Sequence, residues 1–553
     1  MKLRIACLSL LLLAVSALAA PKPPQAAIAS AHPLATAAGM QVLQEGGNAF
    51  DAAIAVSAAL AVVEPYSSGL GGGGYYLLHV AKDNHDLMVD GRETAPAAAS
   101  HDMYLDKSGD LKTSSVRRGA LSAGIPGTPA ALVDMAKYGR LTLAQDLAPA
   151  IALARAGFKV DKRFAAITDE TSGTLNLLCK PDCPFLKDGH APVVGSVLQQ
   201  PALAATLELI ASKGAAGFYA GDVAREMVDA VRAVGGVWTL DDLQHYRVIE
   251  RAPVSGDYRG YHIVTASPPA SGGVVLLETL NILSGYDLDK MDGATRAHYI
   301  VEAWRRSYRD RNQYLGDPDF VKMPLARLLS SDYAASLRAG INPGRGTPSD
   351  TLPPVLTQGE GVDTSHYSIL DQDGNMVAAT QTVNFRYGSG ILGGKSGVIL
   401  NDEMDDFAAK PGEANGFGLV QGEANAVAPG KRPLSSMTPT FVEGPQGVAI
   451  IGTPGGSRIT TMVTLALLDF IAGGSADHMT ALPRYHQQYL PDSVSYEPGA
   501  FGEAELAALA KMGYSLRQVD RPYGNMNVVV WDYKTGKVEA ATDPRDKDAL
   551  VDF

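Results

Sequence analysis

The chain has 553 residues, of which 46% are hydrophobic and 19% charged, and its formal net charge at pH 7 is −12. This composition is typical of a folded globular protein that is long enough for several domains or for one large layered fold. The acidic surplus, without a cluster of lysines and arginines, argues against nucleic acid or an anionic membrane surface as a partner.

The first twenty residues differ from the remainder of the chain. Lys2 and Arg4 precede an apolar run at 5–13, and an Ala-Leu-Ala segment at 17–19 follows as a small-residue cleavage pattern. The apolar run is shorter than the roughly 18 residues that a membrane-spanning helix needs. We therefore predict that residues 1–20 are a signal peptide, so that the mature protein is exported and keeps no membrane anchor.

Cysteine usage agrees with export. Cys7 would leave with the signal peptide, whereas Cys179 and Cys183 remain in the segment Cys-Lys-Pro-Asp-Cys. A short disulfide loop is expected for such a pair in an oxidising compartment. Two thiolates without further ligands nearby do not fill a tetrahedral metal site, so we expect no metal here.

Two helices are predicted at 35–45 and 51–63, followed by a glycine run at 69–74 and a strand at 75–80. The glycines fit the pattern G-x-G-x-x-G. A dinucleotide-binding fingerprint, however, lies between a preceding strand and a following helix, and here the order is helix, glycines, strand. We therefore exclude dinucleotide binding.

The region from about 128 to 345 is predicted to be mainly helical. One helix begins at Thr128-Pro129 and closes at Gly139, and further helices are expected at 142–157, 199–235 and 295–314. A segment rich in Pro, Gly and Thr at 352–361 is typical of an exposed linker. Beyond it, strands alternate with glycine turns, and one long apolar helix is expected near 460–472.

A β-hairpin begins at the end of that linker. A three-residue loop, Gln372-Asp373-Gly374, places its glycine in the left-handed position just before the return strand. This register pairs Thr364 with Thr382 and puts Asn384 on the same face, because side chains alternate with period two. A cross-strand threonine pair alone is a common structural feature of sheets.

A second candidate feature is the turn at 453–458, which precedes the apolar helix. Its adjacent glycines, Gly455 and Gly456, could present backbone N–H groups to an oxyanion, although a simple tight turn explains them equally well. The chain has no H-E-x-x-H, G-x-S-x-G, P-loop or C-x-x-C motif, so zinc peptidase, α/β-hydrolase and NTPase functions lose support.

Several segments in fixed order closely resemble the γ-glutamyltranspeptidase family. They are TSHYS at 364–368, NDEMDDF at 401–407, KRPLSSM at 431–437 and PGGSR at 454–458, with EGGNA at 45–49, GGGG at 71–74, DGRE at 90–93, IPGT at 125–128 and YLGDPDF at 314–320 upstream. The resemblance covers nearly the whole mature chain.

The resemblance implies an α+β fold, the four-layer αββα sandwich of N-terminal nucleophile hydrolases. It also implies a precursor that cuts itself between Asp363 and Thr364 into a large subunit, 21–363, and a small catalytic subunit, 364–553. A threonine hydroxyl is a weak nucleophile and needs a base. The freed α-amine, with a reference pKa of about 7.7–8.0, suits that role.

Site residues follow from the same resemblance. Thr364 would be the nucleophile and Thr382 would orient it, while Gly455 and Gly456 would form the oxyanion hole. The substrate-binding residues fall into two groups, one for the α-carboxylate of the γ-glutamyl group and one for its α-ammonium: Arg92, Ser435 and Ser436 for the first, and Asn384, Glu403 and Asp406 for the second.

The resemblance further implies that glutathione and related γ-glutamyl amides donate the acyl group, and that water, amino acids or dipeptides accept it. No cofactor is expected, the two subunits form a heterodimer, and the compartment is the periplasm or the medium. Residues 411–429 match a lid loop, in which Phe417 stands where well-known bacterial members have tyrosine. Lacking a hydroxyl to bond Asn384, this lid is expected to close less tightly.

Two alternatives remain. One is a relative in the same family that removes glutaryl or similar acyl groups from β-lactam nuclei, but its substrate lacks the α-ammonium that Asp406 would bind. The other is an exported protein that binds ligands without catalysis. A binding protein would not need Thr364, Thr382 and the glycine pair together.

Overall fold

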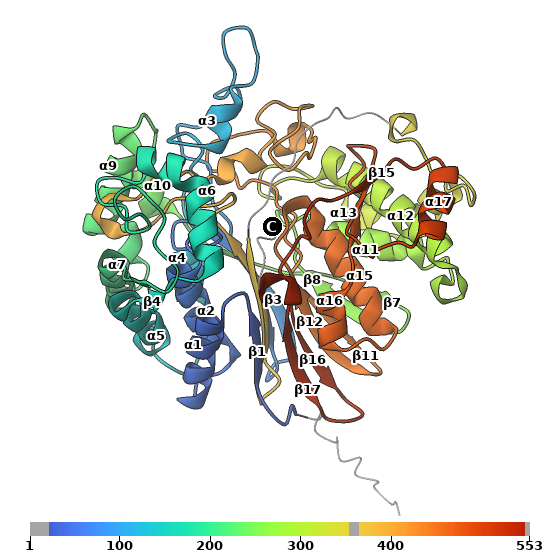
Figure 1. The fold of residues 1–553 in the computed structure, drawn as a ribbon, viewed down its shortest axis with the longest axis horizontal. Coiled ribbons are helices and arrows are strands. Elements are labelled where there is room, and N and C mark those ends of the chain that lie inside the picture. Colours follow the sequence, from blue (N-terminus) through green and yellow to red (C-terminus); the bar gives the residue numbers. More distant parts are fainter. Residues whose placement is uncertain (1–21, 353–363, 548–553) are drawn as a thin grey trace, which may run out of the picture.

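The computed structural model describes residues 22–352 and 364–547. Two six-stranded sheets lie face to face in the centre, and each has helices on its outer side (Figure 1). The order of layers is therefore αββα, which confirms the predicted fold class. The predicted signal peptide, Asp363 and all but the first residue of the predicted linker lie outside the described residues.

Both sheets are antiparallel throughout. The first has the order β1-β9-β10-β2-β3-β6, formed by Ala27–Ser30, Ser365–Leu370, Met376–Thr382, Gly73–Val80, His85–Gly91 and Ile249–Arg251. The second has the order β17-β16-β12-β11-β8-β7, formed by Val538–Thr542, Asn527–Asp532, Gly447–Gly452, Thr440–Gly444, Tyr261–Thr265 and Val254–Tyr258.

Strand β2 shows how the layers share one core. Tyr76 and Leu78 pack among the helices outside the first sheet, whereas Tyr75 and Leu77 face the second sheet. All four side chains are buried. Because successive side chains of a strand point to opposite faces, a strand covered on both sides needs apolar residues at every position.

The helices outside the first sheet come from the N-terminal part of the chain: α1 Pro33–Gln44, α2 Ala49–Val63, α4 Thr128–Met135, α5 Leu143–Ala156, α6 Lys162–Leu178, α7 Pro201–Lys213, α8 Ala216–Tyr219, α9 Gly221–Ala233 and α10 Leu240–His245. Helix α2 is buried along its whole length, as expected for a helix that is apolar on all sides. Asn48 and Asp51 close its N-terminus as a capping box.

The helices around the second sheet are α11 Gly272–Leu283, α12 Gly293–Tyr314, α13 Leu325–Leu328, α14 Ser331–Ala339, α15 Ile459–Ile471, α16 Ala476–Ala481 and α17 Glu503–Lys511. The short helix α3, Thr113–Arg117, and two small sheets complete the fold: β4 Phe158–Lys159 with β5 Val197–Leu198, and β13 Tyr485–His486, β14 Val494–Tyr496 and β15 Leu516–Gln518. No helix within the described ranges is long and apolar enough to cross a membrane.

Most predicted helices are present, with two corrections. The run at 199–235 is three helices, because Gly214 and Gly221 adopt positive φ angles of 60° and 69° and end the helical path. The mainly helical region also contains β6, β7 and β8, which the sequence did not predict. Strand β8 pairs with β7 across the turn at Arg259 and Gly260 and, on its other side, with β11, which is far away in sequence.

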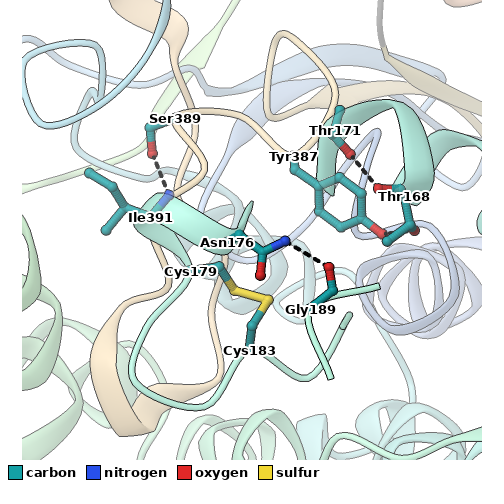
Figure 2. Close-up of a disulfide and its surroundings, with 9 residues drawn as sticks. All are labelled: Thr168, Thr171, Asn176, Cys179, Cys183, Gly189, Tyr387, Ser389 and Ile391. Atoms are coloured by element: carbon teal, nitrogen blue, oxygen red, sulfur yellow. Dashed lines mark hydrogen bonds between the residues drawn. A yellow bond between two sulfur atoms is a disulfide. The ribbon is translucent and has the colours of Figure 1, made fainter. Parts of the chain in front are cut away.

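Cys179 and Cys183 form a disulfide at the C-terminal end of α6 (Figure 2). The segment that follows the disulfide contributes Phe185, whose ring centroid lies 5.1 Å from that of Tyr387. The hydroxyl groups of Tyr387 and Thr168, on α6, lie 2.6 Å apart. The disulfide region and α6 therefore brace the segment that follows Asn384.

Candidate active site

The predicted hairpin is present in the predicted register. Strands β9 and β10 pair from Leu370–Met376 to Ser365–Gln381, so the next pair along the hairpin is Thr364 with Thr382. Gly374 closes the loop with a φ of 92°, which is the left-handed conformation that the prediction assigned to it. Thr364 thus lies at the open end of the hairpin, and its residue is 6% exposed.

A narrow pocket lies at this end. It brings together most of the predicted site residues, from the end of the β9–β10 hairpin and from loops and short 3-10 turns: Thr364, Thr382, Asn384, Glu403, Asp406, Phe417, Ser435, Ser436 and Gly456. Gly455 lines an adjoining pocket, and Arg92 does not line either of the two.

Asn384 directly follows the hairpin and is held in a demanding conformation. Its φ is 75°, a left-handed value that asparagine tolerates better than most residues. Its backbone N–H donates to the Thr382 hydroxyl over 2.7 Å, and its side-chain amide donates to the Asp402 carbonyl oxygen over 2.9 Å. These bonds fix the carboxamide and the second threonine together.

The glycine run before β2 has a steric explanation. A Cβ on Gly72 would lie 1.8 Å from the carbonyl oxygen of Thr382, and a Cβ on Gly71 would lie 2.0 Å from that of Ile399. Only glycine permits these backbones to approach so closely. The run therefore positions the hairpin.

Arg92 lies behind the pocket in a buried ion cluster. Its two terminal nitrogens contact the carboxylates of Glu403 and Asp406, and its Nε donates to the carbonyl oxygen of Pro433 over 3.1 Å. Burial raises the pKa of Glu403 to about 8, although the Arg92 guanidinium opposes that shift. Burial raises the pKa of Asp406 as well. The structure thus joins the three residues that were predicted to bind opposite ends of the substrate.

Arg311, on α12, lines the pocket and was not predicted as a site residue. It is 1% exposed and donates to the hydroxyls of Ser271 and Ser436 over 2.8 and 3.2 Å. No described carboxylate forms an ion pair with it. Burial lowers its pKa to about 10, so it stays charged at neutral pH. The sequence does contain a hint of this role, because Arg311 lies three residues before the YLGDPDF segment that resembles the family.

The glycine turn joins β12 to α15 through a short 3-10 helix, Gly456–Arg458. Gly455 and Gly456 have φ angles of 142° and 53°, a backbone that favours glycine at both positions. A Cβ on Gly455 would lie 2.5 Å from the terminal methyl carbon of Met462. The glycine turn therefore has a fixed backbone conformation beside the pocket that contains Thr364.

Phe417 and Leu419 form part of the pocket wall. The Phe417 ring stacks on that of Phe385, with centroids 5.2 Å apart and an interplanar angle of 10°. The backbone carbonyl oxygen of Phe417 accepts a hydrogen bond from the side-chain amide of Gln488 over 3.1 Å. Aromatic stacking and a backbone contact hold Phe417 without a side-chain hydroxyl.

Comparison with known proteins identifies the family. The model of the gamma-glutamyltranspeptidase family matches residues 35–553. The glutathione hydrolase proenzyme of Pseudomonas sp. (strain A14) is 45% identical over 480 residues, which cover 85% of this chain and 83% of that protein. The corresponding proenzyme of Escherichia coli (strain K12) is 40% identical over 534 residues, or 95% and 91% of the two chains.

Among solved structures, the cephalosporin acylase from Bacillus halodurans superposes with a TM-score of 0.82 at 28% identity, covering 95% of each chain. In the described part of the chain, no group of three or more His, Cys, Asp or Glu residues is placed to hold a metal ion. The family match over almost the whole sequence, together with the shared αββα fold, shows that this chain belongs to the γ-glutamyltranspeptidase family.

Proposed function

We propose that this protein is a γ-glutamyltransferase and glutathione hydrolase that acts through Thr364. The observation that carries this proposal is the pocket at the end of the β9–β10 hairpin, where Thr364 and Thr382 meet Gly456, two buried carboxylates and two serines. A nucleophile, an oxyanion-binding turn and a charged subsite are the parts that acyl transfer from a γ-glutamyl amide requires.

The first chemical step is attack of the Thr364 hydroxyl on the γ-carbonyl carbon of the donor. The hydroxyl proton passes to the α-amine of Thr364, and the backbone N–H groups of Gly455 and Gly456 stabilise the tetrahedral oxyanion. Collapse breaks the C–N bond, and the proton leaves with the amine product. A γ-glutamyl ester on Thr364 remains, which water or an amine then cleaves.

This mechanism requires a free α-amine, and therefore cleavage between Asp363 and Thr364. The Thr364 hydroxyl would attack the carbonyl carbon of Asp363, and water would resolve the resulting ester. The mature enzyme would be a heterodimer of residues 21–363 and 364–553. Residues 1–20 would direct it to the periplasm or the medium before they are removed.

The polar end of the donor would occupy the charged side of the pocket. Glu403 and Asp406 suit the α-ammonium group, with the Asn384 carboxamide beside them. Ser435 and Ser436 would bind the α-carboxylate, with Arg92 and its ion cluster behind. Arg311, whose guanidinium reaches Ser436 over 3.2 Å, adds positive charge on the carboxylate side.

Removal of glutaryl groups is the second candidate, because the fold superposes closely on that of a cephalosporin acylase. Glu403 and Asp406 both line the pocket and share the single guanidinium of Arg92 behind it, so this cluster has one more acidic group than basic and favours a substrate that carries a cation. A glutaryl group has none. A protein that only binds a ligand would not need a threonine, Thr364, at the open end of the hairpin.

The purified protein can be assayed with matched γ-glutamyl and glutaryl anilides. We expect kcat/KM for the γ-glutamyl anilide to be at least about 100-fold higher than for the glutaryl anilide, because one charged pair in a buried site contributes about 3 kcal/mol. Asp406→Asn should remove most of that preference. Preferential glutaryl turnover would establish the acylase instead, and no turnover of either compound would favour a binding protein.

A further inference from the structure

A second pocket adjoins the first. The two share Phe417 and Ser457 in their walls, so these residues form the partition between them. Gly455 lines the second pocket and Gly456 lines the first. The glycine turn that would hold the oxyanion is therefore the boundary between the two pockets.

Among the described residues, the second pocket is lined by basic side chains and by no acidic ones. Arg458 and Arg517 belong to its wall, and no aspartate or glutamate of the described ranges does. Arg458 lies with its guanidinium carbon 4.5 Å from the centroid of the buried Tyr523 ring. No described residue forms an ion pair or a side-chain hydrogen bond with Arg458. A cation placed this way can receive an anion from a ligand.

The remaining walls combine the apolar side chains of Phe417 and Pro491 with polar, uncharged ones. The carbonyl oxygen of the Gln488 side chain lies 2.8 Å from Nε2 of His486, while the amide of Gln488 donates to Phe417. The other ring nitrogen of His486 lies 2.9 Å from the Thr461 hydroxyl. Burial lowers the pKa of His486 to about 3, so the imidazole is neutral. A pair of serines, Ser493 and Ser495, also lines the pocket.

From this geometry we propose that the second pocket binds two molecules in turn: the amine product that leaves after the first step, and the amino acid or dipeptide that accepts the γ-glutamyl group. In both cases the carboxylate of the ligand would bind Arg458. This inference rests on the proposed function. One pocket serves both molecules, because attack by an amine is the reverse of amine departure.

In the transfer step, the acceptor's amino nitrogen attacks the carbonyl carbon of the γ-glutamyl ester on Thr364. The new C–N bond forms and the C–Oγ bond breaks. One proton of the amine passes through the Thr364 α-amine to Oγ, which restores the hydroxyl. A ligand whose carboxylate lies on Arg458 would extend its amino end toward the glycine turn.

The test compares two acceptors that differ only in charge, glycylglycine and glycylglycinamide, with γ-glutamyl-p-nitroanilide as the donor. The wild-type enzyme should have a KM for glycylglycine about tenfold below that for the amide, equivalent to about 1.4 kcal/mol. Arg458→Gln should raise the KM for glycylglycine to that of the amide and leave the amide's KM unchanged. Arg458→Lys should retain part of the preference.

Arg521→Gln is the matched control, because Arg521 is half-exposed in the same part of the chain and does not line the pocket. It should leave both acceptor constants unchanged. Equal use of the two acceptors by the wild-type enzyme would overturn the inference without any variant, and so would a preference that survives Arg458→Gln. Failure of the wild-type enzyme to release p-nitroaniline would instead contradict the proposed function.

Discussion

Gly72 lies so close to Thr382 that a Cβ on the glycine would stand 1.8 Å from the threonine's carbonyl oxygen. This contact fixes the end of the hairpin against the glycine run before β2, and so fixes the position of the second threonine relative to Thr364. The glycine run at 69–74, whose sequence fits a dinucleotide-binding pattern, therefore contributes to the site by allowing two backbones to pack closely.

Gly72→Ala should displace the hairpin end. We expect a loss of about 2–4 kcal/mol in the free energy of unfolding, because two backbones must separate, and a large loss of turnover. Gly173→Ala is the control, since Gly173 lies on an exposed face of α6 and a Cβ at this position would have no neighbouring atom within 4 Å. It should stabilise the protein by about 0.5–1 kcal/mol. Denaturant titration of both variants measures the difference.

Arg311→Gln should weaken donor binding. The variant removes a buried positive charge beside Ser436, so the KM for a γ-glutamyl donor should rise about tenfold, as expected for loss of a charge-assisted hydrogen bond. The kcat should change less, because Thr364 and the glycine turn are untouched. Steady-state kinetics separate the two constants. A KM equal to that of the wild-type enzyme would remove Arg311 from the carboxylate subsite.

Donor binding should depend on pH through Glu403. Burial raises the pKa of this carboxyl to about 8, so it is mostly protonated at pH 6 and becomes ionised as the pH rises. Only the ionised form attracts the donor's α-ammonium. The KM for the donor should therefore fall between pH 6 and pH 8, and Glu403→Gln should flatten this part of the profile. A variant whose KM still falls over that range would show that another group titrates.

Phe417→Tyr should tighten donor binding. The ring lies in the pocket wall, and a phenolic hydroxyl would add a hydrogen-bonding group to the pocket that Asn384 also lines. The stack on Phe385 can accept a tyrosine ring of the same shape. We expect a lower KM for γ-glutamyl donors. Unchanged KM and kcat would mean that the hydroxyl has no partner there.

The hairpin register could be predicted from sequence because one glycine, Gly374, defines a local loop. The cluster of Arg92 with Glu403 and Asp406 could not, because the partners lie 311 and 314 residues apart along the chain. Strand β6 was missed for a similar reason, because its partner β3 lies far away in sequence. Arg311 was missed because its polar contacts, to Ser271 and Ser436, arise only when α12 packs beside distant loops. The roles of the individual site residues came from the resemblance to the γ-glutamyltranspeptidase family, because the local sequence patterns did not determine them.

Intact-mass measurement and N-terminal sequencing of the wild-type protein and Thr364→Ala show whether Thr364 is a nucleophile released by self-cleavage. We expect two wild-type fragments, the smaller beginning Thr-Ser-His-Tyr at residue 364, and an uncut Thr364→Ala chain. A wild-type protein that stays in one piece, or a Thr364→Ala variant that is cut at the same bond, would contradict this expectation.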